Sequence, residues 1–249
     1  MASEPRSPRL AVLIDADNVS ARIADGLFED IAKIGEASVR RIYGDFSGTR
    51  LKSWADMLPR HAIIPHHNVA NTPGKNATDI ALVIDAMDLL HSGRFDGFCL
   101  VSSDSDFTRL ASRIREHGTD VYGFGERKTP ESFRQACLRF IYTENLLPAA
   151  PDRDPTPESQ PLPPKPKDSI PILRRAITLL DDEDGWVGLS AVGSQLGKLA
   201  PDFDPRTYGH AKLSDLVKRT GVFEVELPKG KGMRIRPKKS PKQKSVAKK

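Results

Sequence analysis

Four aspartates stand where apolar, strand-like runs give way to polar residues. Asp15 ends the run LAVLID, Asp104 and Asp106 follow FCLVSS, and Asp79 lies at the start of the apolar segment TDIALVID. If these segments meet at one edge of a sheet, the carboxylates repel one another and lose hydration, which a hard cation such as Mg²⁺ or Mn²⁺ would neutralise. Such a cation activates a bound water or, as a pair about 3.5–4 Å apart, holds the attacking and leaving oxygens of a phosphodiester. The predicted chemistry is metal-dependent hydrolysis.

The same acids have structural interpretations that stay open. Asp79 could interact with the positive end of its own helix, with Asn76 as the cap. Asp104 or Ser105 could cap the helix expected at 106–117, and Asp15 could satisfy nearby backbone. A cap needs one acid per helix start, whereas two acids follow a single strand here and another ends the first strand. This number favours a site.

Other polar residues near these acids belong to the site only if their side chains point toward it. Asn18 could orient a carboxylate or a metal-bound water, which makes it a supporting residue. The direction of Asp17 stays undecided, because alternation does not extend past the strand end. Asp85 and Asp88 share a helix with Asp79, and at about 100° per residue Asp85 points well away from Asp79, so both are left out of the metal set.

A rival interpretation comes from the stretch IDADNV, which fits the D-x-D-x-[T/V] pattern of haloacid-dehalogenase-type phosphatases. In those enzymes the first aspartate is a covalent nucleophile. Their late acidic pair, spaced as in G-D-x-x-x-D, does not have the form of SSDSDF. A dinucleotide-binding domain is disfavoured, because no G-x-G-x-x-G follows the first strand.

The elements that must position the acids alternate along the first part of the chain. Short β-rich runs alternate with segments of helical periodicity, which predicts an α/β fold with a parallel sheet and helices on both faces. Ligands of such sheets collect outside the carboxyl ends of the strands. The expected strands are 9–15, 37–44, 61–66, 95–101 and 119–124, and the expected helices include 20–34, 76–90, 106–117 and 130–146.

Length and composition restrict the class of protein. The chain has 249 residues, and no apolar run reaches the roughly 18 residues of a membrane-spanning helix. The start lacks an export leader, so a cytoplasmic protein without a membrane partner is expected. The only cysteines, Cys99 and Cys137, lie in apolar stretches and are expected in the core.

Proline and charge divide the chain. Residues 148–168 contain eight prolines and are expected as a semi-rigid linker. Residues 229–249 carry ten Lys or Arg and no Asp or Glu, against 28 basic and 33 acidic residues elsewhere. Such a tail is expected to be disordered, and either solubilises the protein or contacts nucleic acid. The expected organisation is a disordered 1–8, a first domain at 9–147, the linker, a second domain at 169–228 and the tail.

The first domain resembles the NYN domain, a branch of the PIN-like nuclease superfamily. The runs LIDADN, KNATDIALVIDAMDLL, FCLVSSDSDF and YGFGERKTPESFRQACLRFIY carry the resemblance. It implies a central parallel sheet, an acidic Mg²⁺ or Mn²⁺ pocket and endonucleolytic cleavage of RNA. Ser103 stands where that family usually has glycine. Motif by motif, the resemblance implies site roles for Asp15, Asn18, Asp79, Asp104 and Asp106.

The second domain resembles the LOTUS or OST-HTH domain, a small winged helix linked to RNA binding. Its elements are G-W-V, F-D-x-R-x-Y-G and K-L-x-D-L-V. Apolar spacing predicts three short amphipathic helices followed by a strand at 222–227. Trp186, Phe203 and Tyr208 are more often core residues in a domain this small. The candidate RNA-binding residues are Tyr208, His210, Lys212, Lys218 and Arg219.

Together these features predict a metal-dependent endoribonuclease whose RNA is captured by the winged helix and the basic tail. Lys75, four residues before Asp79, is the expected phosphate contact near the pocket. The alternative is a nuclease-inactive RNA-binding adaptor, since some relatives have lost cleavage. The resemblance also leaves open a homo-oligomer or a protein partner through the C-terminal domain.

Overall fold

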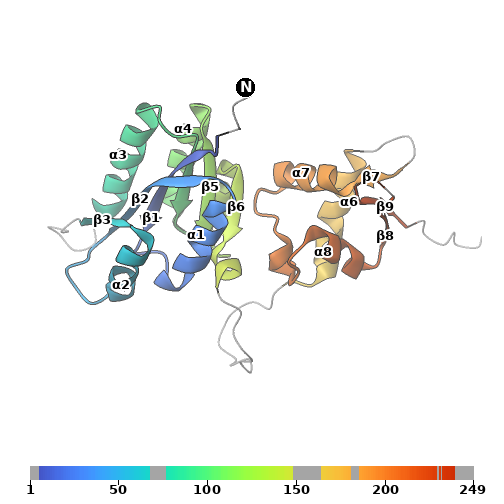
Figure 1. The fold of residues 1–249 in the computed structure, drawn as a ribbon, viewed down its shortest axis with the longest axis horizontal. Coiled ribbons are helices and arrows are strands. Elements are labelled where there is room, and N and C mark those ends of the chain that lie inside the picture. The colour runs from blue at the N-terminus through green and yellow to red at the C-terminus, as the bar shows by residue number, and fades with distance from the viewer. Residues whose placement is uncertain are drawn as a thin grey trace, which may run out of the picture. The chain divides into compact units, whose positions relative to one another are not determined.

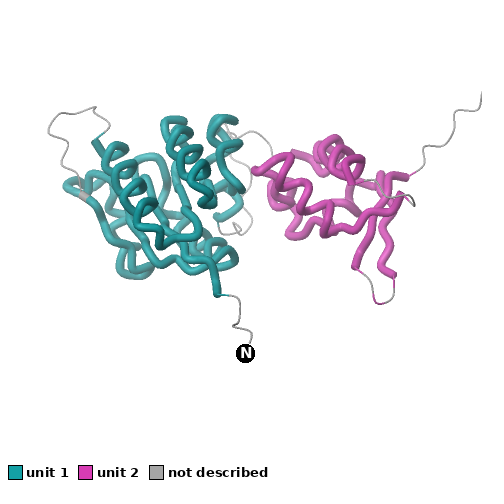
Figure 2. Tube along the Cα trace, turned by 90° about the horizontal axis from the view of Figure 1, so that it is seen from above, with its two compact units in different colours: residues 1–158 teal, residues 159–249 magenta. Residues whose placement is uncertain are grey.

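The computed structural model describes residues 6–67, 77–147, 164–180, 185–228, 230 and 232–238. The chain divides into two compact units, residues 1–158 and 159–249 (Figure 2). Each unit has its own core and is described separately. In the described residues, no helix is both long and apolar enough to span a membrane.

Unit 1 is built on a six-stranded sheet in which every neighbouring pair is parallel. The strand order is β3-β2-β1-β4-β5-β6, so the chain builds outward from β1 on one side and then from β4 on the other. The order reverses between β1 and β4, and the crevice at the carboxyl ends of such a pair is where α/β sheets bind ligands. The strands are β1 (Arg9–Asp15), β2 (Glu36–Gly44), β3 (Ile64–His67), β4 (Gly97–Val101), β5 (Asp120–Gly125) and β6 (Arg139–Tyr142).

Helices cover both faces of this sheet (Figure 1). Side chains of β1 alternate between two cores: Val12 packs in the one that contains Leu27 and Trp54, and Leu13 in the one that contains Leu82. Because both faces are buried, β1 is apolar from Leu10 to Ile14, between Arg9 and Asp15 at its ends. The helices are α1 (Ala24–Ala32), α2 (Lys52–His61), α3 (Ala77–His91), α4 (Thr108–Glu116) and α5 (Glu131–Ala136), with 3-10 turns at Ala21–Ile23, Ser105–Phe107 and Thr143–Leu146. The predicted α/β class is confirmed.

The helix expected at 130–146 is wrong. Helix α5 ends at Ala136, Cys137 has an extended backbone, and β6 follows. Phe140 and Ile141 are buried on opposite faces of the sheet, and β6 pairs with β5. A four-residue run is too short for periodicity to separate strand from helix, and pairing with β5 decides it.

Smaller differences lie at other element ends. The strand expected from His61 begins at Ile64, because α2 continues through His61 and ends at Ala62 in a left-handed conformation with φ 50°. At the N-terminus, residues 6–8 were expected to be disordered but are described. The Pro8 carbonyl accepts a 2.8 Å hydrogen bond from the Glu36 N–H, which extends the pairing of β1 with β2.

The described residues of unit 2 form three α-helices and a small antiparallel sheet of order β7-β9-β8. Its core contains Leu173, Val192, Val217, Phe223 and Ile235. This arrangement confirms the predicted winged-helix class. The elements are α6 (Ile170–Thr178), β7 (Val187–Gly188), α7 (Leu189–Leu199), α8 (Leu213–Thr220), β8 (Phe223–Glu226) and β9 (Arg234–Pro237), with 3-10 turns at Pro166–Ser169 and Pro205–Tyr208.

Unit 2 extends beyond both ends expected from the sequence. Strand β9 lies inside the segment expected as a disordered tail, and Ile235 on it is fully buried. Its two arginines are neutralised by strand β8, since Arg234 pairs with Glu226 at 2.7 Å and Arg236 with Glu224 at 2.6 Å. Composition alone misses this, because the segment folds only against β7 and β8.

At its start, unit 2 includes residues expected as linker. The Asp168 carboxylate accepts a 2.7 Å hydrogen bond from the Lys165 N–H and caps the first turn, and Ser169 is buried. The linker's residues 148–163 and the tail beyond Lys238 lie outside the described residues.

Candidate active site

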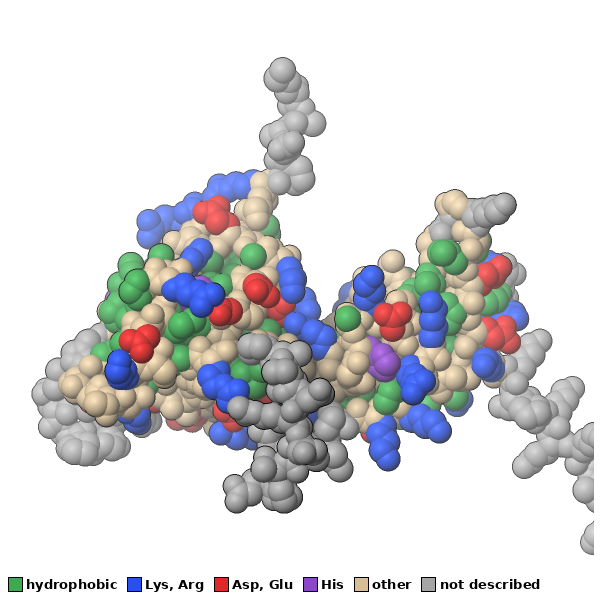
Figure 3. All heavy atoms as spheres, turned by 60° about the horizontal axis from the view of Figure 1, so that its bottom comes forward, with side chains coloured by type: hydrophobic (Ala, Val, Ile, Leu, Met, Phe, Trp, Pro, Cys, Tyr) green, Lys and Arg blue, Asp and Glu red, His purple; other side chains and the backbone are tan. Residues whose placement is uncertain are grey.

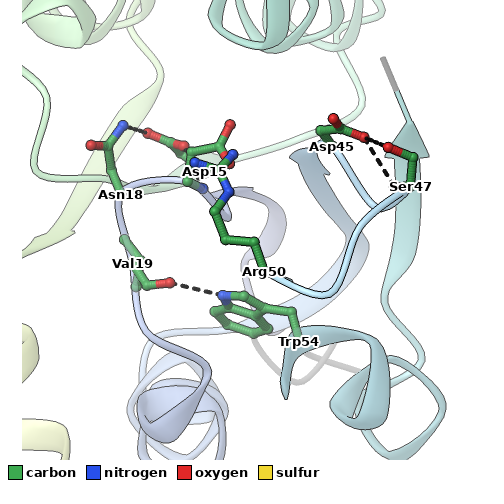
Figure 4. Close-up of polar contacts among 8 residues, drawn as sticks. Asp15, Asn18, Val19, Asp45, Ser47, Arg50 and Trp54 are labelled. Carbon is green, nitrogen blue, oxygen red and sulfur yellow. Dashed lines mark hydrogen bonds and ion pairs between the residues drawn. The ribbon is translucent and has the colours of Figure 1, made fainter. Parts of the chain in front are cut away.

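Asp15 ends β1 at the point where the strand order reverses. It is 1% exposed and accepts three hydrogen bonds, and Figure 4 shows the one from Asn18. Asn18 Nδ2 and Ser102 Oγ each donate to Oδ2 at 2.7 Å, and the Asp17 N–H donates to Oδ1 at 3.1 Å. Burial raises the pKa of Asp15, and the hydrogen bonds from Ser102 and Asn18 lower it in part. The three hydrogen bonds hold the Asp15 carboxylate in one orientation.

Ser102 was not among the residues predicted from the sequence. It directly follows β4, is 1% exposed, and its Oγ also accepts the Asp104 N–H at 3.0 Å. The signal was present, because Ser102 is the first polar residue after a buried strand, as Asp15 is on the neighbouring strand. A serine hydroxyl carries no charge, so charge repulsion does not select it.

Asp79 faces the charges of the same edge of the sheet from the first turn of α3. Its pKa is raised to about 6, first by burial and then by the charges of Asp15, Asp104 and Asp106, with a smaller part from Asp17. Those charges come from the end of β1 and the loop after β4. The structure therefore brings the four predicted acids into one electrostatic cluster.

One of the four acids also has the structural role considered for it above. Asp104 caps the 3-10 turn Ser105–Phe107, since its Oδ1 accepts the Asp106 N–H at 2.9 Å. Asp106 itself is exposed. In the described part of the chain, no three His, Cys, Asp or Glu side chains are close enough together to hold a metal ion. The acids are near enough to raise the pKa of Asp79, but they do not form a ready coordination shell.

A cavity of about 360 Å³ lies beside Asp15 at the end of β1. Asp17 lines it and forms an ion pair with Arg50, which extends toward Asp15 from the segment that leads into α2 (Figure 4). The direction of Asp17, undecided from the sequence, is thus toward this cavity. Other lining residues include Asn18, Trp54, Glu126 and Lys128.

Asp85 lies on another side of α3, as its helical position predicted. Its Oδ2 pairs with Arg41 at 2.7 Å and accepts a 2.6 Å hydrogen bond from the Tyr43 hydroxyl. Burial, together with this contact to Asp85, raises the pKa of Tyr43. Asp88 is exposed. Lys75, the expected phosphate contact, lies outside the described residues.

In unit 2 the predicted RNA-binding residues differ in exposure. Lys212, Lys218 and Arg219 are exposed at the two ends of α8. Lys and Arg side chains gather on the face of unit 2 seen in Figure 3. Tyr208 is half-buried against Phe203, with ring centroids 5.8 Å apart, and burial raises its pKa. His210 is also half-buried.

Trp186 was expected mainly as a core residue but is half-buried. The guanidinium carbons of Arg234 and Arg236 lie 4.8 and 4.4 Å from the centroid of its ring. The indole therefore packs under two charges on β9, an arrangement that sequence reasoning missed because it treated β9 as tail.

Comparison with known families agrees with this architecture. The NYN domain model matches residues 9–146, and the OST-HTH/LOTUS domain model matches residues 164–235. The chain belongs to the NYN domain family and carries an OST-HTH/LOTUS domain after it. Together the two domains support a nuclease or RNA-binding role.

Two solved structures are similar to parts of the chain. A protein of unknown function from Vibrio parahaemolyticus RIMD 2210633 matches with a TM-score of 0.49 and 19% identity, over 59% of this chain and 99% of that one. An uncharacterized protein of Nitrosomonas europaea matches with a TM-score of 0.28 and 32% identity, over 38% of this chain and 93% of that one. No curated protein matches the chain.

Proposed function

We propose that this protein is a metal-dependent endoribonuclease that cleaves RNA phosphodiesters at the acidic cluster. The observation that carries the proposal is the convergence of Asp79 with the charges of Asp15, Asp104 and Asp106 where β1 and β4 end. Crowded carboxylates oppose folding unless a cation neutralises them, which favours a site that binds a cation. Membership of the NYN family supports the same chemistry.

The donor set fits Mg²⁺ or Mn²⁺, because it consists of carboxylate oxygens that repel one another. Asp15, Asp79, Asp104 and Asp106 are the residues that would hold such an ion. When bound, it would supply a water of lowered pKa and stabilise charge on the phosphate.

The remaining residues of the site orient Asp15. Asn18 and Ser102 hold its Oδ2 through two hydrogen bonds of 2.7 Å, and this leaves Oδ1 with a single weaker donor, the Asp17 N–H at 3.1 Å. We assign Oδ1 as the atom that faces the reaction and Asn18 and Ser102 as positioning residues. A fixed carboxylate reduces the reorganisation that the reaction requires.

Capture of the RNA strand belongs to unit 2 and the basic C-terminal residues in this proposal. The exposed Lys218 and Arg219 lie in the last turn of α8, the exposed Lys212 lies at its N-cap, and five further lysines follow Lys238 in the sequence. Phosphate contacts by such residues give sequence-independent affinity. Tethering them to unit 1 raises the local concentration of substrate at the acids.

A cleavage assay tests the proposal. Full-length protein is incubated with single-stranded and structured RNA in Mg²⁺ and in Mn²⁺, with and without EDTA. We expect wild-type cleavage that disappears in EDTA and in Asp15→Asn but persists in Asp88→Asn, a matched change at an exposed residue of α3. Equal cleavage by wild type and Asp15→Asn would identify a contaminating nuclease and refute the assignment.

A second candidate function is a nuclease-inactive RNA-binding adaptor. Two observations favour it: the absence of a preformed three-ligand metal group in the described residues, and the capping role of Asp104. It predicts RNA binding without cleavage under every metal condition of the same assay. For the phosphatase interpretation, release of phosphate from small esters without strand cleavage is the distinguishing result, and we expect none.

A further inference from the structure

The cavity beside Asp15 is lined by two oppositely charged pairs. Arg50 pairs with Asp17, and Lys128 pairs with Glu126 at 2.8 Å, all four residues being among those that line it. The arginine and lysine side chains are 68% and 73% exposed, so both cations reach solvent. The cavity thus presents two accessible cations next to the loop that follows Asp15.

The base of Arg50 is fixed although its guanidinium is exposed. The next residue, Leu51, is 5% exposed. Trp54, one turn further on, is 1% exposed, and its Nε1 donates a 2.8 Å hydrogen bond to the Val19 carbonyl in the loop after β1. Figure 4 shows the side chain of Arg50 extending from beside this indole toward Asp15. Buried neighbours therefore hold the backbone of Arg50 close to the loop that carries Asp17.

Asp17 lies between Arg50 and the cluster. Its N–H donates to Asp15 Oδ1, and its carboxylate charge contributes to the raised pKa values of Asp15 and Asp79. The same carboxylate neutralises Arg50. Any anion that takes Arg50 must therefore compete with Asp17.

We propose that this cavity is a phosphate-binding subsite for a single-stranded nucleic acid, in which Arg50 leaves Asp17 and binds a phosphodiester next to the scissile one. The proposal rests on the proposed function, because it places the strand beside the acids. Arg50 is a positioning residue here. A guanidinium binds phosphate through two parallel hydrogen bonds, whereas its exposed pair with Asp17 contributes little, so the exchange favours phosphate.

Two variants and their double mutant test the exchange in the full-length protein. Binding of a short fluorescein-labelled single-stranded RNA is measured by anisotropy in EDTA, where a metal-dependent activity is silent. Arg50→Gln should weaken binding about tenfold and reduce the slope of log K against log salt by about 0.7. Asp17→Asn frees Arg50 and should tighten binding about threefold. In the double variant the gain from Asp17→Asn should be lost.

The ion pair between Lys52 and Asp56 on α2 gives a matched control. It is separated by 3.6 Å, is exposed on both sides, and does not line the cavity. Lys52→Gln and Asp56→Asn make the same charge changes and should alter binding less than about twofold. Thermal unfolding of every variant verifies the fold.

Two results overturn the subsite: Arg50→Gln binding RNA as Lys52→Gln does, or the gain from Asp17→Asn persisting when Arg50 is absent. The outcome is separable from that of the proposed function. If wild type never cleaves RNA but the coupling of Arg50 and Asp17 is found, the subsite stands and the nuclease assignment fails. If Asp15→Asn abolishes cleavage and the coupling is absent, only the subsite fails.

Discussion

Ser102 Oγ lies 2.7 Å from Asp15 Oδ2, although the two residues are 87 positions apart in the sequence. The contact exists because β4 pairs with β1 and both strands end at the same edge of the sheet. It joins the buried carboxylate to the loop that carries Asp104 and Asp106. Asp15 is thereby oriented by the neighbouring strand as well as by Asn18 on its own loop.

Replacing Ser102 by alanine should shift the pH dependence of cleavage. The hydrogen bond from Ser102 lowers the pKa of Asp15, which burial raises, so its loss should raise that pKa further. Less Asp15 is then ionised at acidic pH. We expect the acidic limb of the pH–rate profile to move to higher pH, so that the rate falls more at the acidic end of the profile than at its alkaline end. Ser105→Ala, at an exposed position in the same loop, is the control, and profiles that coincide would contradict the role.

The free energy of unfolding should reveal the charge on Asp79. Its folded pKa, about 6, lies above its ordinary value of 3.8, so between these values the folded protein binds more protons than the unfolded chain. This group therefore destabilises the cation-free protein as pH rises from about 4 to 6. Asp79→Asn should stabilise the protein by about 1 kcal/mol near pH 7, after allowance for solvent screening, and by nothing near pH 4.

Denaturant unfolding in EDTA measures this difference at both pH values. Asp88→Asn provides the control, since Asp88 is exposed on the same helix. A variant that is no more stable than wild type near pH 7 would show that Asp79 is not in the field of the other acids.

Divalent cations should stabilise unit 1 through the same carboxylates. A ligand that binds only the folded state adds about 2.7 kcal/mol at a hundredfold excess over its dissociation constant. We expect Mn²⁺ to raise the unfolding temperature of wild type and to leave Asp15→Asn and Asp79→Asn unchanged, as followed by differential scanning calorimetry. An equal rise in all three proteins would place the cation elsewhere.

Two truncations should separate the roles of the C-terminal residues. Removing residues 239–249 deletes five lysines but leaves β9, so RNA binding should weaken and its salt dependence should flatten, by up to about 0.7 in log–log slope per lost phosphate contact, without a change in unfolding. Removing residues 229–249 also deletes Ile235, which is fully buried, and should unfold unit 2.

Circular dichroism melting and anisotropy with labelled RNA measure these two effects. RNA binding that is unchanged without residues 239–249 would mean that those lysines only solubilise the protein. If unit 2 stays folded without residues 229–249, the packing of β9 contributes little to its stability.

Neutralising two cations of α8 should weaken RNA binding. Lys218 and Arg219 are exposed in its last turn, so Lys218→Gln with Arg219→Gln should lower affinity and reduce the salt slope by about 1.4. The matched control is Arg174→Gln with Arg175→Gln, both exposed on α6. Equal losses in the two double variants would indicate attraction by overall charge instead of a contact face on α8.

The sequence by itself determined the class of both units and the places where polar residues follow buried strands. Strand β1 was predicted with its observed bounds, because a uniformly apolar run that ends in a charged residue is a local signal. Its end also pointed to Asp15 and Asn18. Motif resemblance then supplied the family, which the family models confirm.

The tertiary structure alone decided which of these residues meet. The pairing of β1 with β4 brings Ser102 to Asp15, the start of α2 brings Arg50 to Asp17, and β9 completes the sheet of unit 2. Tertiary structure also decided that residues 139–142 form a strand and not a helix, because they pair with the free edge of β5. Local periodicity carries no information about strand order, and contacts between distant segments depend on that order. The charges that raise the pKa of Asp79 therefore became visible only once the sheet was assembled.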